Sequence, residues 1–164
     1  MANSRILVLG IGNLLLGDEG VGIHAIRLFE NEQWPKEVSF LDRGTGGFRL
    51  LSYLEDYPHV IIIDASLDDF QEGTSRHIRP KFASDFPPSL SAHEIGLKDL
   101  VDALVLLDQW PDIHLLAVSI KDLDRLSLEL SPEVQNALEQ IRVNLNRIIE
   151  SILTSSKREN TPTT

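Results

Sequence analysis

Hydrophobic and polar positions follow two alternating patterns along this chain. Short, uninterrupted apolar runs that end at glycine or aspartate are typical of strands buried on both faces of a parallel sheet. Segments with an apolar residue every three or four positions predict amphipathic helices. The predicted strands are Ile6–Leu9, Val38–Leu41, Val60–Ile63 and Ile113–Ile120, with a weaker, alternating strand over Thr74–Arg79. The predicted helices are Glu19–Glu32, Phe48–Leu54, Ser91–Val105 and Ser131–Ile152.

Strands and helices therefore mostly alternate, which predicts an α/β fold with a largely parallel sheet and helices on both of its faces. The 164 residues fit one domain with a single core. We expect that domain to span residues 1–154, because the polar segment 155–164 has the composition of a frayed, flexible tail. A long loop is expected over Pro80–Ser91, where Pro87 and Pro88 exclude regular structure.

The composition narrows the classes of function. With a formal net charge of -10, the chain lacks the excess of Lys and Arg with which nucleic-acid and anionic-membrane binders neutralise phosphate. It has no cysteine, so a metal must be held through oxygen and nitrogen. No apolar stretch approaches the roughly 20 residues that span a bilayer, and we expect a soluble, cytoplasmic protein.

A glycine pair after the first strand suggests a dinucleotide-binding loop. Gly10 and Gly12 match the start of the G-x-G-x-x-G pattern, but Leu15 occupies the position of the third glycine. A pyrophosphate binds at the partially positive N-terminus of a helix, and here Asp18 and Glu19 already place two negative charges at that end. The two carboxylates favour a cation over a phosphate, so we interpret the loop as part of a different kind of site.

Three side chains with metal-binding chemistry fall at the junctions of predicted strands and helices. They are Glu19, Asp64 and His93. In a parallel α/β domain these junctions meet at one edge of the sheet, where such folds bind their ligands. Two carboxylates and one imidazole at that edge predict a divalent-metal site with open coordination positions. Each residue also has an ordinary structural explanation as a cap or a helix-dipole charge, and the neighbouring Asp18 fits a cap of the first helix.

The remaining candidates carry weaker signals. Asp42, followed by a glycine-rich segment, could accept a hydrogen bond or bind a cation where the backbone of another chain comes close. The other four histidines, His24, His59, His77 and His114, have no carboxylate partner at a recognisable ligand spacing, so we interpret them as structural. Neither the H-E-x-x-H metalloprotease motif nor the G-x-S-x-G serine hydrolase motif occurs.

Four blocks of this sequence together resemble the [NiFe]-hydrogenase maturation endopeptidases. The first, ILVLGIGNLLLGDEGVG over residues 6–22, is similar to the N-terminal signature of that family. The others, in chain order, are DRGTGG over 42–47, IIIDA over 61–65 and SAHEIGL over 91–97. The similarity covers nearly the whole chain, to about Ile152, and its first and last blocks are highly specific. Arg43 departs from the pattern, because many members have glycine there, and it places a cation beside the expected recognition loop.

The resemblance implies a fold, a task and a site. The implied fold is a three-layer αβα sandwich around a twisted sheet. The implied activity is that of an endopeptidase, which removes a short C-terminal extension from the hydrogenase large-subunit precursor after nickel insertion. The metal ligands of the family fall on Glu19, Asp64 and His93. Nickel, held in the precursor mainly by cysteine thiolates, would gain oxygen and nitrogen donors from this chain. The complex is expected to be transient and the protein to be a monomer.

Two alternatives and one chemical question stay open at this point. The chain could be a non-catalytic nickel chaperone of hydrogenase assembly, or a conventional metallohydrolase of small peptides that keeps its own metal. In the peptidase, the amide could be attacked by an activated water beside a metal-polarised carbonyl, with Asp42 or Glu19 as the base. The metal could instead serve only to report that nickel is present in the precursor.

Overall fold

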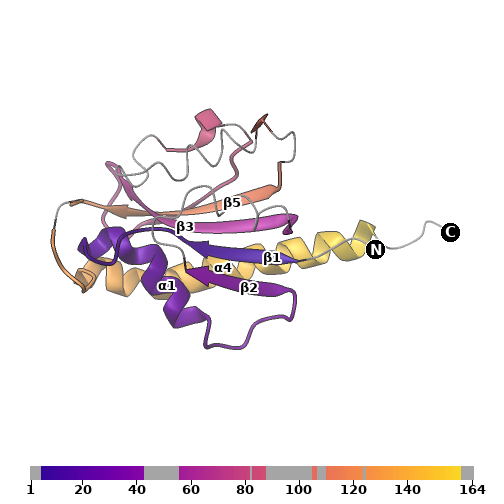
Figure 1. Ribbon diagram of the computed structural model, residues 1–164, viewed down its shortest axis with the longest axis horizontal. Helices are drawn as coiled ribbons and strands as arrows, with labels where there is room; N and C mark the ends of the chain where they lie inside the picture. The colour runs from indigo at the N-terminus through magenta and orange to yellow at the C-terminus, as the bar shows by residue number, and fades with distance from the viewer. Residues whose placement is uncertain are drawn as a thin grey trace.

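The computed structural model describes residues 5–42, 56–81, 83–87, 105–106, 110–123 and 125–159. Within them, five strands form one sheet in the order β2-β1-β3-β5-β4 (Figure 1). The strands are β1 (Ile6–Gly10), β2 (Val38–Asp42), β3 (His59–Leu67), β4 (Ser75–Ile78) and β5 (Asp112–Ile120). All neighbouring pairs are parallel except β4 with β5, so the sheet is largely parallel, as predicted, with one antiparallel edge strand.

The described helices are the 3-10 turn η1 (Gly17–Gly20), α1 (Val21–Phe29), the short 3-10 turn η2 (Ala83–Asp85) and α4 (Pro132–Glu159). α1 and α4 pack against the same face of the sheet, where they share one apolar core with β1, β3 and β5. A second core covers the opposite face and includes Phe86 and Trp110 from the connecting segments. The sheet is therefore buried on both faces, and the predicted α/β sandwich is confirmed. The predicted helix Phe48–Leu54 lies outside the described residues, and of Ser91–Val105 only Val105 is described, in a helical conformation.

α4 begins where the sequence predicted and ends later. The hydroxyl of Ser131 accepts a hydrogen bond from the backbone N–H of Val134 (3.4 Å), which is the expected helix cap. The helix then continues to Glu159, so residues 155–159 of the predicted flexible tail are helical. Ser156 in this extension is buried one turn beyond Ile152, and its hydroxyl donates to the Ile152 carbonyl (3.0 Å). Figure 1 shows the end of α4 on the side of the sheet where the parallel strands begin. None of the helices in these described ranges is long and apolar enough to cross a membrane.

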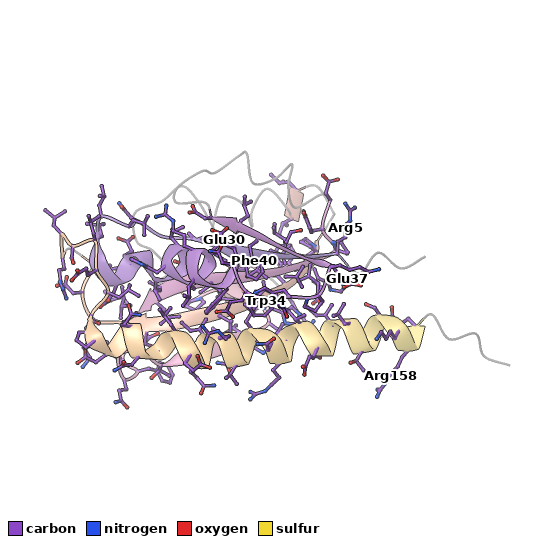
Figure 2. All side chains as sticks on the ribbon, turned by 90° about the horizontal axis from the view of Figure 1, so that it is seen from below. Arg5, Glu30, Trp34, Glu37, Phe40 and Arg158 are labelled. Atoms are coloured by element: carbon purple, nitrogen blue, oxygen red, sulfur yellow. The ribbon has the colours of Figure 1, made fainter. Side chains whose placement is uncertain are left out.

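α1 is shorter than the predicted helix Glu19–Glu32 at both ends. Its first turn is replaced by η1, and its last residue is Phe29. The indole N–H of Trp34 donates to the Phe29 carbonyl (2.7 Å), which satisfies a carbonyl at the helix end. Trp34 also packs between the rings of Phe29 and Phe40, with centroid distances of 6.3 and 5.3 Å. Trp34 and Phe40 lie between the sheet and α4 (Figure 2), and both pack against the core that contains Phe29. Tertiary packing thus stops the helix before the proline break that the sequence suggested.

Candidate active site

The carboxyl edge of the sheet is stepped, and Asp64 lies on the step. β1 ends where Gly10 pairs with Ile63, whereas β3 and β5 continue side by side for four more residue pairs. The backbone N–H of Ile11 donates to the carbonyl of Ile63 (3.0 Å) at the point where the chain leaves β1. Asp64 is therefore the first residue of β3 beyond the end of β1. The sequence had predicted that β3 would stop at this aspartate, and the structure carries the strand on to Leu67.

The Asp64 carboxyl group is completely buried. Its exposed fraction is 0%, and its Oδ1 accepts a hydrogen bond from the backbone N–H of Ala65 (2.8 Å). Ile63 and Ala65 belong to the core beneath α1 and α4, and because side chains alternate along a strand, Asp64 points to the opposite face. A buried carboxylate is costly unless its charge is compensated, so its position in an apolar strand indicates a function.

Glu19 is the second buried carboxylate at this edge. It lies in η1, which packs directly against β3, and its exposed fraction is 2%. The backbone N–H of Glu19 donates to the Leu16 carbonyl (3.2 Å), the i to i-3 bond of a 3-10 turn. The tight turn therefore fixes Glu19 against the central strand, at the same end of the sheet as Asp64.

Two glycines make this packing possible. A Cβ atom on Gly22 would overlap the carbonyl oxygens of Ile63 and Ile11, so the start of α1 touches the backbone beside Asp64. A Cβ on Gly12, whose φ is +145°, would overlap the carbonyl oxygen of Glu19. Backbone-to-backbone contacts thus bring the predicted ligand loop and the predicted ligand strand together. Both carboxylates therefore belong to elements that pack together at the carboxyl end of the sheet.

Asp18 has a different role from the expected helix cap. Neither η1 nor α1 has a side-chain cap bond. Instead, Asp18 Oδ1 accepts a hydrogen bond from the backbone N–H of Ser131 (2.7 Å), directly before α4. A hydrogen bond therefore links Asp18, the residue next to Glu19, to the start of α4. The interpretation as a cap was wrong because a partner 113 residues away leaves no local signal.

Asp42 ends β2 and pairs with Arg27 of α1. The Arg27 Nε atom lies 2.9 Å from Asp42 Oδ2, and both side chains are partly exposed. This ion pair was not predicted from the sequence, in which Arg27 is one cation on a helix with an apolar face. The candidate base Asp42 therefore has a guanidinium partner. Arg43 and the glycines of segment 44–47 lie outside the described residues.

The third predicted ligand, His93, also lies outside the described residues. Among the residues that are described, no three His, Cys, Asp or Glu side chains gather into a group that could hold a metal ion. Glu19 and Asp64 can supply carboxylate oxygens, which suit a hard or borderline divalent cation. The predicted three-residue metal site stays a prediction, with Glu19 and Asp64 as its two described members.

His24, on α1, is the histidine nearest in sequence to this edge. Burial lowers its pKa, and the neighbouring Arg27 guanidinium lowers it further against an opposing effect of Asp18. The imidazole is therefore neutral at pH 7. Its buried Nε2 atom has no hydrogen-bond partner within the described part of the chain.

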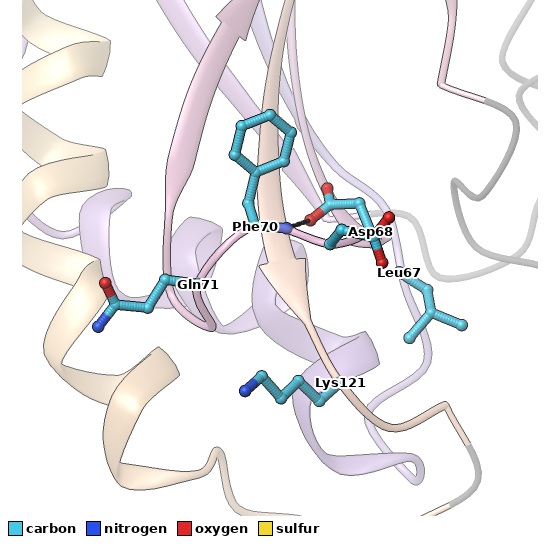
Figure 3. A pocket seen from close by; sticks show the side chains of 6 residues that line it. Leu67, Asp68, Phe70, Gln71 and Lys121 are labelled. Atoms are coloured by element: carbon cyan, nitrogen blue, oxygen red, sulfur yellow. Dashed lines mark hydrogen bonds between the residues drawn. The ribbon is translucent and has the colours of Figure 1, made fainter.

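A hollow of about 800 Å³ lies further along the same edge, beyond the last residues of β3 and β5 (Figure 3). Leu67, Phe70 and Lys121 are among its lining residues, together with Asp68. Burial alone would raise the pKa of Asp68, but the nearby hydroxyls of Ser119 and Ser66 and the hydrogen bonds from the Phe70 N–H and Arg76 lower it more. Asp68 is thus an anion with local partners. The sequence predicted only a polar turn here, because the hollow forms where two separate strands end.

Another polar cluster, unexpected from sequence spacing, occupies the opposite end of the sheet. Asp112 Oδ2 lies 3.0 Å from His59 Nδ1 and 3.1 Å from His114 Nε2. His114 Nδ1 lies 2.9 Å from His77 Nε2, and the two rings stack with centroids 5.1 Å apart. The guanidinium of Arg79 also pairs with Asp112. These residues come from β3, the β4 segment and β5, so only the strand pairing reveals the cluster.

Comparison with known proteins shows the family to which the chain belongs. A family model described as hydrogenase maturation protease matches residues 23–148. The chain is 33% identical to the hydrogenase 2 maturation protease of Escherichia coli, over 82% of this chain and 84% of that protein. It is 35% identical to the hydrogenase expression/formation protein HupD of Bradyrhizobium diazoefficiens, over 74% of this chain and 65% of that protein.

Solved structures agree with these sequence matches. The hydrogenase maturating endopeptidase HybD from Escherichia coli superposes with a TM-score of 0.73 at 34% identity, and the match covers 87% of this chain and 93% of that one. The [NiFe] hydrogenase maturation protease HybD from Thermococcus kodakarensis gives a TM-score of 0.70 at 26% identity, with 88% and 99% covered. This chain therefore shares its fold with these endopeptidases over most of its length.

Proposed function

We propose that this chain, which belongs to the hydrogenase maturation protease family, is an endopeptidase that removes the C-terminal extension of a [NiFe]-hydrogenase large-subunit precursor after nickel insertion. The observation that carries the proposal is the pair of buried carboxylates, Glu19 and Asp64, at the step of the sheet edge. They come from two of the sequence blocks that resemble the family, and His93 comes from a third.

Nickel enters this proposal as part of the substrate. The ion arrives bound in the precursor, and Glu19, Asp64 and His93 add oxygen and nitrogen donors that nickel accepts. The nickel ion thereby docks the precursor to this chain, so docking itself depends on the nickel having been inserted. The burial of both carboxylates supports this role, because carboxylates are rarely buried without a charged or metal partner.

The chemical step is hydrolysis of one peptide bond. Water adds to the carbonyl carbon as a base takes its proton, and the C–N bond then breaks as the amine nitrogen gains a proton. Asp42 and Glu19 are the candidate bases of this chain. Asp42 is tied to Arg27, whereas Glu19 is set in the tight turn. Holding the scissile bond beside such a group can lower the barrier by ~7–11 kcal/mol in the best intramolecular cases.

We place the reaction in the cytoplasm, in a transient complex of the precursor with one copy of this chain. The alternative function, a non-catalytic nickel chaperone, would use the same carboxylates without cleaving any bond. A metallohydrolase of small peptides would need no nickel-loaded protein substrate. The three functions therefore differ in what happens to the mass of the precursor.

The test is the intact mass of the precursor after incubation with this protein, in nickel-loaded and nickel-free forms. Loss of a C-terminal peptide from the nickel-loaded form alone is the expected result. Cleavage of both forms would keep the peptidase and remove nickel from recognition. A nickel-loaded precursor that binds but keeps its mass would contradict the peptidase and favour the chaperone.

A further inference from the structure

The side chains of Asp42 and Asp64 lie on opposite faces of the sheet. In β2, Phe40 packs against the core beneath α1 and α4, whereas Leu41 packs against the core on the other face. Because side chains alternate along a strand, Asp42 returns to the face of α1, where Arg27 pairs with it. Asp64 belongs to the other face, since its two neighbours in β3 are part of the core beneath α1. The two carboxyl groups therefore leave the sheet in opposite directions.

A whole strand and part of a helix separate these two carboxylates. Gly10 of β1 pairs with Asp42 of β2 on one side and with Ile63 of β3 on the other. Neighbouring strands are ~4.8 Å apart, so the Cα atoms of Asp42 and Ile63 lie about 10 Å apart. A Cβ atom on Gly10 would overlap the carbonyl oxygen of Gly22, so α1 fills the space above β1. A general base must come within about 3 Å of the proton that it takes, or act through one water. Asp42 is too far from a bond held beside Asp64 to do so.

The helix α1 connects Asp42 with the turn that contains Glu19. η1 ends at Gly20 and α1 begins at Val21, so the turn and the helix are continuous. Near the other end of the helix, Arg27 Nε lies 2.9 Å from Asp42 Oδ2, and the two side chains are 57% and 35% exposed. The ion pair therefore joins the last turn of α1 to the end of β2, while η1 packs against β3. A shift of α1 relative to the sheet would move Glu19 with it.

We infer that Asp42 is a positioning residue, which acts on Glu19 through Arg27 and α1, and that it is not the base of the hydrolysis. This inference rests on the proposed function, and it leaves Glu19 as the candidate base among the described residues. The expected size of the effect separates the two roles of Asp42. General base catalysis supplies about 10²- to 10⁴-fold in rate. A partly exposed ion pair contributes at most about fivefold to an equilibrium.

The first test is a double-mutant cycle of D42N, R27M and R27M/D42N, with cleavage of the nickel-loaded precursor followed by mass spectrometry. We expect each single variant to lower kcat about three- to fivefold with KM unchanged. The double variant should be no slower than either single one, because all three lack the same contact. R79M is the matched control, since Arg79 pairs with Asp112 at the amino end of the sheet and the two side chains are 58% and 32% exposed. R79M should keep the wild-type kcat.

The second test exchanges the charges of the pair. R27E alone sets two carboxylates against each other and should lower kcat. R27E/D42R restores an ion pair between α1 and β2 but has no carboxylate at position 42, so it should recover kcat to within about twofold of wild type. A base at position 42 could not be replaced by arginine, which has no proton-accepting group at neutral pH. Thermal unfolding of every variant is compared with that of R79M, so that a general loss of stability is recognised.

The outcomes separate this inference from the proposed function. A loss of hundredfold or more in kcat for D42N, with R27M close to wild type, would make Asp42 the base and overturn the inference while the peptidase stands. Wild-type kcat in both D42N and R27M would overturn the positioning role, again with the peptidase intact. A wild-type chain that cleaves neither form of the precursor would contradict the proposed function, and the inference would fail with it.

Discussion

The two ends of the sheet hold buried or half-buried carboxylates in opposite ways. At the amino end, side chains fix Asp112: two histidines and an arginine surround it. At the carboxyl end, close backbone contacts at Gly12 and Gly22 and the 3-10 turn place the chain segments that bear Glu19 and Asp64. At the amino end, Asp112 joins side chains of neighbouring strands. At the carboxyl end, Glu19 and Asp64 lie beside the step in the sheet edge. The comparison separates a structural polar cluster from a candidate site.

The hydrogen bonds of the amino-end cluster converge on one carboxylate. A carboxylate only accepts hydrogen bonds, so His59 donates from Nδ1 and His114 from Nε2 to Asp112. A further hydrogen bond joins His114 Nδ1 to His77 Nε2. The hydrogen bond from His114, followed by that from His59, holds the pKa of Asp112 far below its usual range. Asp112 thereby binds His59 and His114 directly and His77 through His114, a carboxylate partner that the sequence spacing did not reveal.

The largest expected effect is the loss of a carboxylate charge at the carboxyl end. D64N keeps the oxygen that accepts the Ala65 N–H but removes the negative charge of the Asp64 side chain. E19Q likewise removes the negative charge of the Glu19 side chain in η1. Both variants should lower the rate of precursor processing by at least about hundredfold, because a neutral amide is a poor metal ligand. Mass spectrometry of the cleaved precursor measures the rate, and thermal unfolding checks the fold. The exposed D56N variant is the control, and wild-type processing by D64N would contradict the site.

The second effect tests whether backbone contacts set the site. G22A introduces a methyl group into the carbonyl oxygens of Ile63 and Ile11. The free energy of unfolding should fall by ~1–3 kcal/mol, as in other overpacked interiors, and processing should fall with it. G20A is the graded control, since its Cβ would lie 3.1 Å from Asn13 O, a tight but smaller intrusion. Urea unfolding gives the energies, and equal losses in the two variants would argue against a specific role of Gly22.

The third effect belongs to the amino end. D112N replaces the acceptor of two histidines by a group that also donates, which leaves a hydrogen bond unmade near buried His114. We expect a loss of ~1–3 kcal/mol in the free energy of unfolding, measured in urea. The kcat of precursor processing should stay unchanged, because this end contains no proposed ligand. A large drop in kcat with normal stability would show that the two ends are coupled.

The smallest effect is a pH dependence from His77. Burial, then the His114 and Arg79 charges, lower its pKa below the ordinary 6.5. The unfolded chain therefore binds a proton more readily than the folded chain, so stability is complete above about pH 6.5 and falls as the pH drops below it. Thermal unfolding between pH 8 and 5.5 should show this slope, and H77Q should flatten it. An unchanged slope in H77Q would assign the effect to His24, whose pKa is also lowered.

The sequence predicted the fold better than it predicted the contacts of the site. Apolar runs such as Ile6–Leu9 identified the strands, and a serine and proline marked the start of α4. The sequence predicted the ends of β3 and α4 too early, because the polar residues Asp64, Ser66 and Ser156 looked like element ends. In the structure these residues are buried by neighbours that are distant in the sequence. The rule that strand–helix junctions of a parallel sheet lie at its carboxyl edge predicted that edge as the position of Glu19 and Asp64.

The contacts that seat the site residues were beyond any local pattern. The Gly22–Ile63 contact and the bond from Ser131 to Asp18 join positions far apart in the chain. The Asp112 cluster depended on register, since His59 faces Asp112 only in the observed pairing of β3 with β5. Such contacts follow from three-dimensional packing and not from spacing in the sequence.

The bond between Asp18 and Ser131 also has a consequence for how the protein is made. Its two ends are 113 residues apart, so the loop with Glu19 leaves the ribosome long before its partner does. An isolated parallel bridge between Leu16 and Ser127 has the same delay. The first strands can pair early. The turn that holds Glu19 forms its contacts with Ser127 and Ser131 only when the last third of the chain has emerged. A nascent or prematurely terminated chain would therefore lack a finished site, and activity would begin only with nearly complete synthesis.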